Sequence, residues 1–134
     1  MALEDGLLIV AGAASALAVI HGLRLARLDR ERATYPLLLI FVAGVYVAFA
    51  VGARAPLAAG IEAGLALPFV ALAVLGHLRN RLWLVAGWIG HAALDLGHHR
   101  LVVDPGVPEA YPWLCLGFDL VVAAHLLRPR RRAA

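Results

Sequence analysis

Long apolar runs separated by short polar segments dominate this chain of 134 residues. A helix that crosses a membrane needs about 20 mostly apolar residues, and several runs approach that length. They extend over about residues 7–25, 35–53, 56–78, 82–103 and 111–127. The segment before the last run, Asp104-Pro105-Gly106-Val107-Pro108-Glu109, has the proline, glycine and acid content of a loop. The pattern predicts an all-α, polytopic transmembrane helical bundle of about five spans, built by residues 1–134 as a single domain.

Small residues and prolines add detail to this prediction. The first run contains the segment Ala11-Gly12-Ala13-Ala14-Ser15-Ala16, which suits close packing against another helix. In the third run, Gly60 and Gly64 flank Glu62 in a small-xxx-small pattern that predicts a second close helix contact. Pro68 lies inside the same run and predicts a kink, because a proline within a helix removes one backbone hydrogen bond.

The distribution of arginine predicts the orientation. If five spans alternate in direction, most arginines share one side of the membrane: Arg24, Arg27, Arg30, Arg32, Arg79, Arg81, Arg128, Arg130, Arg131 and Arg132. Only Arg54 and Arg100 fall on the other side. Because basic residues concentrate on the cytoplasmic side, we expect the N-terminus outside and the C-terminus in the cytoplasm. The bias toward Ala, Gly, Leu, Val and Arg is typical of high-GC bacterial genes, so we expect a multi-pass protein of the bacterial inner membrane.

Composition agrees with a membrane protein. Hydrophobic residues make up 63% of the chain and charged residues 16%, whereas soluble domains are about 45–50% apolar and about 25% charged. Topology accounts for the excess of arginine, so no nucleic-acid partner is predicted. The single cysteine, Cys115, excludes an intramolecular disulfide. The acidic start of the chain predicts that the first run is retained as a span and not removed as a signal peptide.

One stretch of the fourth run concentrates ionisable groups in an otherwise apolar environment. It holds His91, Asp95, His98 and His99. The first three occupy positions i, i+4 and i+7, which share one face of a helix. Because ionisable groups are costly in hydrocarbon, they mark a functional site by default.

Two further acids lie inside spans, Glu62 in the third run and Asp119 in the fifth. At about 1.5 Å per residue, both lie roughly 9 Å from the outer surface, and Asp95 lies roughly 12 Å from it. Three helices therefore bring acids and imidazoles to one level in the outer half of the membrane. Histidine and carboxylate groups are ordinary ligands of Zn, Fe, Mn and Cu.

These residue types predict a divalent transition metal, with zinc ahead of Fe, Mn and Cu. We expect the metal ligands to come from the fourth-run cluster, His91, Asp95, His98 and His99. Glu62 and Asp119 are the candidate catalytic groups, as a further ligand or as a general base.

The leading functional hypothesis is a metal-dependent, hydrolase-like membrane enzyme that acts on a lipid or other hydrophobic substrate. Three alternatives stay open. The first is a transporter or relay for metal ions or protons. The second is a haem protein with His91 as an axial ligand, and the third is a structural bundle whose polar cluster only fixes helix packing. The lipid bilayer is the expected partner, and assembly into a homo-oligomer stays open.

Three pieces of sequence together resemble a known family. They are Phe41-Val42-Ala43-Gly44, the pattern from Gly87-Trp88 through His91 and Asp95 to His98-His99, and the pair Cys115 and Asp119. They resemble the small bacterial integral membrane proteins of the domain of unknown function 6010 family, over about residues 33–127. The resemblance implies a membrane helical bundle and implies no activity. The combination of histidines and an aspartate is also similar, as a site only, to intramembrane zinc hydrolases of the alkaline-ceramidase type.

Overall fold

A computed structural model describes residues 1–130, and within this range the chain forms five α-helices and no strand. The helices are α1 (Leu3–Leu25), α2 (Thr34–Gly52), α3 (Pro56–Leu78), α4 (Arg81–Leu101) and α5 (Tyr111–Leu127). The all-α prediction is confirmed, and most predicted ends agree with the helix bounds within two residues. Arg131 and Arg132, which the topology prediction used, lie outside the described residues.

Three of the helices, α1, α2 and α3, are each long and apolar enough to cross a membrane. Their outward side chains are apolar: on α1, Leu7 is 63% exposed and Leu17 is 60% exposed. Such a surface suits lipid better than water. The shorter α5 has 17 residues, and α4 has 21 residues but carries the ionisable cluster. The helices therefore have the composition of a membrane protein.

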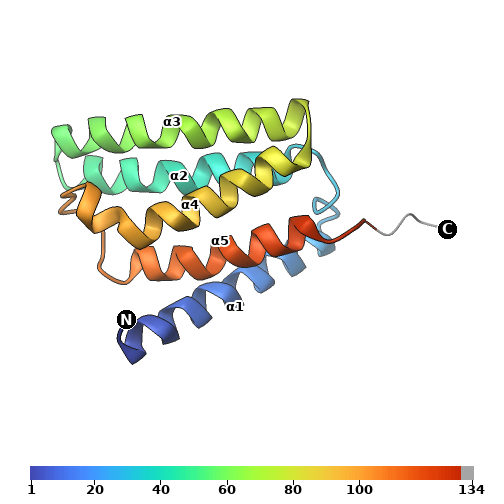
Figure 1. The fold of residues 1–134 in the computed structure, drawn as a ribbon, viewed down its shortest axis with the longest axis horizontal. Coiled ribbons are helices and arrows are strands. Elements are labelled where there is room, and N and C mark those ends of the chain that lie inside the picture. Colours follow the sequence, from blue (N-terminus) through green and yellow to red (C-terminus); the bar gives the residue numbers. More distant parts are fainter. Residues whose placement is uncertain (131–134) are drawn as a thin grey trace.

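The helices lie side by side as an elongated bundle (Figure 1). α3 packs on α2 and α4, α4 packs on α5, and α5 packs on α1. Within the described residues, α1 contacts no helix other than α5. The core between α2, α3, α4 and α5 contains the fully buried Leu39, Trp88 and Val122. Three ionisable residues of α4, namely His91, Asp95 and His98, are buried inside the bundle.

Small residues join α1 to α5, as the sequence predicts. A methyl group on Gly12 of α1 would collide with the backbone of Leu114, and a methyl group on Gly117 of α5 would collide with the backbone of Ile9. The two glycines therefore let the backbones meet at two neighbouring places, and a larger residue at either would force the helices apart.

The predicted close contact at Gly60 and Gly64 is wrong. Both residues are exposed, and a methyl group on either would meet open space. Residues two apart do not share a face of a helix, and Glu62 between them is buried. The glycines consequently point away from the bundle when the acid points into it. Pro68, which the sequence predicts to kink the third run, does not interrupt α3: the helix is continuous from Pro56 to Leu78.

Candidate metal site and its polar neighbours

The described residues contain five buried acidic or histidine side chains, and they come from three helices. They are Glu62 of α3, His91, Asp95 and His98 of α4, and Asp119 of α5, each no more than 2% exposed. The i, i+4, i+7 spacing of the α4 members places them on the face that packs against the neighbouring helices. The structure therefore buries five of the six predicted site residues, all except His99.

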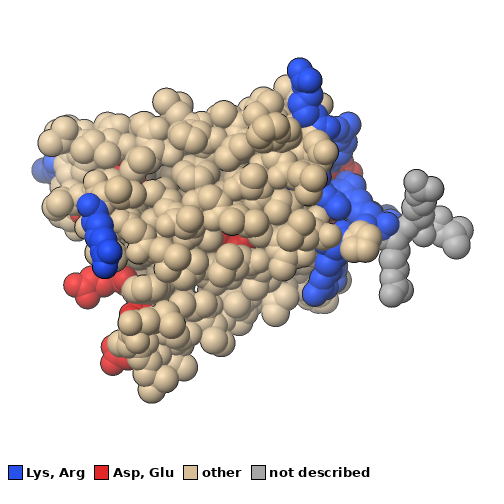
Figure 2. Space-filling model, viewed as in Figure 1, with Lys and Arg blue, Asp and Glu red and all other residues tan. Residues whose placement is uncertain are grey.

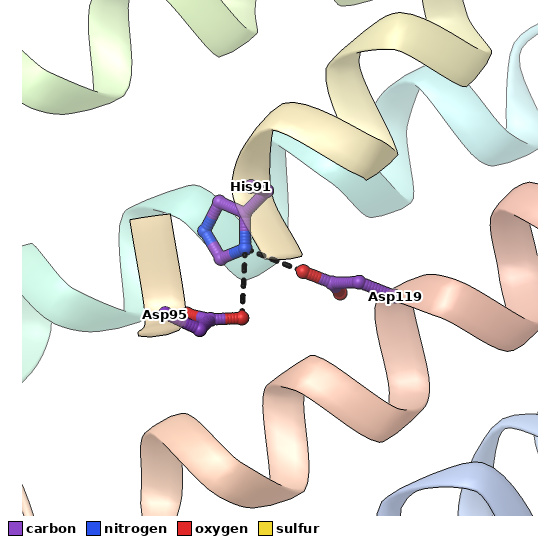
Figure 3. Close-up of side chains that lie close together, drawn as sticks. All are labelled: His91, Asp95 and Asp119. Atoms are coloured by element: carbon purple, nitrogen blue, oxygen red, sulfur yellow. Dashed lines mark hydrogen bonds and ion pairs between the residues drawn. The ribbon is translucent and has the colours of Figure 1, made fainter. Parts of the chain in front are cut away.

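His91, Asp95 and Asp119 form a compact group between α4 and α5 (Figure 3). Nδ1 of His91 lies 2.6 Å from Oδ2 of Asp119, a hydrogen-bond distance, and 3.6 Å from Oδ2 of Asp95. One ring nitrogen thus faces two carboxylates. The aromatic ring of Phe69 meets the imidazole edge-on, with centroids 5.0 Å apart, so one side of His91 packs against an apolar ring.

Each member of this group has one buried polar atom that no hydrogen bond satisfies within residues 1–130. The three atoms are Nε2 of His91, Oδ2 of Asp95 and Oδ1 of Asp119. A buried polar atom without a partner costs roughly 1–3 kcal/mol, and buried charges are normally paired or bound to a metal. Nε2 of His91 points away from the two acids (Figure 3), but the two unpaired carboxylate oxygens belong to side chains that both face Nδ1, and these indicate a site that binds a cation.

The donor set fits a transition-metal ion. The three residues can each offer one ligand atom, and these atoms lie within 4.8 Å of one another. One imidazole nitrogen and two carboxylate oxygens are ligands that zinc, iron and manganese accept. An ion would take the place of the hydrogen between His91 and Asp119, because a ligating imidazole nitrogen carries no proton. The group could hold a metal ion without any further residue moving into it.

Glu62 and His98 form a separate pair. Oε1 of Glu62 lies 2.6 Å from Nε2 of His98, and both side chains are buried. Tyr46 of α2 connects this pair to the metal-site group. Its hydroxyl donates to Oδ1 of Asp95 at 2.6 Å, and its ring stacks on the ring of His98 with centroids 4.0 Å apart. The stack places the two halves of the polar cluster in contact without a hydrogen bond between them.

The predicted site residues are therefore divided by the structure. His91, Asp95 and Asp119 meet, Glu62 and His98 pair beside them, and the structure does not bring His99 to either set. The side chain of His99 is exposed next to Arg100. The reason is the helical period, since His99 lies one position past the buried face that His91, Asp95 and His98 share.

Two residues of this cluster were not identified from the sequence. Tyr46 is a single hydroxyl group within an apolar run, which is a weak signal that could have been noticed. Asp104 belongs to the α4–α5 loop, where its Oδ1 accepts the amide hydrogen of Gly106 at 2.9 Å. Gly106 lies against the backbone of Phe49, and the docked loop brings the Asp104 carboxylate near Glu62. No local pattern marks that contact.

No model of a known protein family, no curated protein and no solved structure matches the chain. The resemblance to the domain of unknown function 6010 family therefore stays a prediction.

Proposed function

We propose that this chain is an integral membrane metalloprotein whose His91, Asp95 and Asp119 bind one divalent transition-metal ion, with zinc as the first candidate. One observation carries the proposal: Nδ1 of the buried His91 faces a carboxylate oxygen of Asp95 and one of Asp119, and each of these acids keeps a buried oxygen without a hydrogen-bond partner within residues 1–130. A cation at Nδ1 would neutralise the two carboxylates and supply a partner for their unpaired oxygens. Within residues 1–130, neither the Glu62–His98 pair nor the Asp29–His125 pair belongs to a group of three such ligands.

We also propose that all five helices cross the membrane, with the N-terminus outside and the C-terminus in the cytoplasm. At about 1.5 Å per residue, a helix of the length of α5 reaches about 26 Å, close to the thickness of the hydrocarbon layer. Basic side chains gather at the end from which the C-terminus leaves, and the middle of the visible face carries none (Figure 2). The bias toward Ala, Gly, Leu, Val and Arg favours the bacterial inner membrane.

The proposed reaction is hydrolysis of a lipid or another hydrophobic substrate. His91, Asp95 and Asp119 would hold the ion with three protein ligands, and a zinc ion held in this way would supply an activated water for attack on the substrate. Asp119 then serves as a ligand, and Glu62, held by His98, is the candidate general base. Because all three side chains are buried, the bundle has to open before a substrate reaches them.

Elemental analysis of detergent-purified protein tests the metal proposal. Wild type is compared with His91→Gln and Asp119→Asn, and His99→Gln is the control because its side chain is exposed one turn from the group. We expect about one zinc per chain in wild type and in His99→Gln, and at least a ten-fold loss in the other two variants. Equal metal content in all four proteins would overturn the assignment of ligands.

A second readout separates loss of metal from loss of fold. Cobalt(II) added to metal-depleted protein gives visible absorption bands that report its ligands, and circular dichroism reports the helices. We expect the His91→Gln protein to keep its helical spectrum and to lose the cobalt bands. A wild-type protein that takes up neither zinc, iron(II), manganese(II) nor cobalt(II) after purification without chelators would end the proposal.

The second candidate function is a proton relay. It is favoured because the five ionisable side chains are buried, so that only a proton or a small ion reaches them. The hydrogen bonds argue against conduction, however. Among residues 1–130 they stop at the ring stack of Tyr46 on His98, and Oδ1 of Asp119 has no partner on the other side. A proton flux in proteoliposomes that Glu62→Gln abolishes would favour the relay.

A further inference from the structure

The end of the bundle opposite the α4–α5 loop carries a pocket of about 770 Å³. It lies between the last turn of α1, the α1–α2 turn, the first turn of α4 and the residues that follow α5. Its lining is strongly basic. It includes Arg24, Arg27, Arg30, Arg81, Arg128 and Arg130. Figure 2 shows the basic side chains at this end.

Asp29 is the single acidic residue among those that line the pocket, and it is already engaged. Its Oδ1 accepts hydrogen bonds from the Tyr35 hydroxyl at 2.5 Å and from Nε2 of His125 at 2.8 Å. Its Oδ2 lies 3.8 Å from Nε of Arg24. Burial alone would raise the pKa of Asp29, but these partners outweigh it and hold the pKa below its ordinary value. The carboxylate therefore stays ionised, and both of its oxygens already face partners within the protein.

The remaining arginines of the pocket have no carboxylate partner within residues 1–130. Arg81 donates to the backbone carbonyl of Arg128 at 3.4 Å, which leaves its charge uncompensated. Positive charges gathered in one hollow repel one another and raise the local concentration of anions. Orientation by the positive-inside rule requires basic residues on this side, but it does not require them to surround a common cavity.

Hydrogen bonds hold the walls of the pocket in place before any ligand arrives. The contact of Asp29 with His125 fastens the α1–α2 turn to α5, across 96 positions of sequence. Thr34 donates to the carbonyl of Leu28 at 2.7 Å and fixes the same turn. A site whose walls are already ordered loses less entropy on binding than a flexible one.

From these observations we infer that the pocket binds a phosphate-bearing anion, either the headgroup of an anionic lipid or a free phosphate ester. Guanidinium groups present paired N–H donors that match the oxygens of phosphate. An adjoining hollow of about 340 Å³ shares Arg81 and Arg130, and its lining mixes the apolar Pro36, Leu84 and Leu126 with the charged Glu31, Arg32 and Arg79. A ligand with an apolar part next to its phosphate would occupy both. This site is independent of the proposed metal centre.

The test measures the thermal unfolding midpoint of detergent-purified protein in titrations with four probes. These are inorganic phosphate, glycerol phosphate, a short-chain phosphatidic acid and a short-chain phosphatidylcholine. The pocket variant is the double substitution Arg27→Gln and Arg128→Gln. The control is Arg54→Gln with Arg100→Gln, which removes the same charge at the other end. The match is close because Arg27 and Arg54 both have a positive φ, 61° and 56°.

We expect saturable stabilisation of wild type and of the control by at least one anionic probe, and at least ten-fold weaker binding by the pocket variant. Binding of phosphate and glycerol phosphate identifies a free ester as the source, whereas binding of phosphatidic acid alone identifies a lipid headgroup. Equal weakening in the two double variants, equal binding of phosphatidylcholine, or no saturable binding at all would overturn the inference. If the glutamine variant does not fold, Arg27→Lys with Arg128→Lys replaces it. The lysine variant keeps the charge but loses the planar guanidinium group with its paired N–H donors, so we expect it to bind the anionic probe several-fold more weakly.

Discussion

At the scale of single residues, Tyr46 orients one of the proposed ligands from outside the ligand set. Its hydroxyl fixes one oxygen of Asp95, which leaves the other oxygen directed at His91. Partners of this kind orient metal ligands, and their loss commonly weakens metal affinity by about 10- to 100-fold. Tyr46 therefore acts as a positioning residue.

The substitution Tyr46→Phe tests this role. It keeps the ring that stacks on His98 and removes only the donor to a buried carboxylate. We expect zinc to bind about 10- to 100-fold more weakly, together with a loss of about 1–3 kcal/mol in the free energy of unfolding. Tyr111→Phe is the control, because the Tyr111 hydroxyl donates to no carboxylate within residues 1–130. Equal zinc affinity in both variants would contradict the positioning role.

Asp29 gives a prediction about pH. Its pKa is lower in the folded protein than its ordinary value of 3.8, so folding favours the ionised form. Its contribution to stability is complete above the ordinary value and is lost as the pH falls through the lower, folded value. We expect Asp29→Asn to unfold at a lower temperature than wild type at pH 7, with the difference shrinking below about pH 4. The exposed Glu31→Gln is the control, and a difference that grows in acid would refute the linkage.

At the scale of the helices, glycine positions distinguish packed faces from lipid-facing ones. Gly117 touches the backbone of α1, whereas Gly60 faces open space. We expect Gly117→Ala to destabilise the protein by about 1–3 kcal/mol through overpacking. Gly60→Ala is expected to be neutral or slightly stabilising, because alanine favours helix over glycine by up to about 1 kcal/mol. Thermal unfolding in detergent measures both, and equal effects would contradict the proposed α1–α5 contact.

The helices were predictable because their signal is local. Apolar runs bounded by charges and prolines mark each helix, and α3 and α5 begin and end where the sequence predicted. It was harder to predict which side of each helix faces the bundle. The glycines beside Glu62 suggested a helix contact, but the cost of exposing the acid directs Glu62 inward and the glycines outward.

Contacts between residues that are far apart in the sequence could not be predicted. The pairing of His98 with Glu62 and of His125 with Asp29 depends on how helices cross, and side-chain period alone does not encode it. The period did identify His91, Asp95 and His98 as one face. The period does not predict that His98 pairs with Glu62 whereas His91 pairs with Asp119.

At the scale of the whole molecule, the proposed topology has five helices that cross the membrane. Single cysteines placed in a Cys115→Ala background test this. We expect Glu109→Cys, in the α4–α5 loop, to react with an impermeant maleimide in intact cells. Arg30→Cys, in the α1–α2 turn, is expected to react only after permeabilisation. Labelling of both positions from the same side would contradict the proposed topology, although it would leave the site geometry untouched.

The central claim is that His91, Asp95 and Asp119 hold a metal ion, and X-ray absorption spectroscopy on zinc-loaded protein tests it most directly. We predict a first shell of nitrogen and oxygen at about 2.0–2.2 Å with scattering from a single imidazole. His91→Gln is expected to remove the imidazole contribution. A sulfur shell at about 2.3 Å would bring in Cys115, and scattering from two or more imidazoles would bring in His98 or His99. Either result, or protein that binds no zinc, would contradict the assigned site.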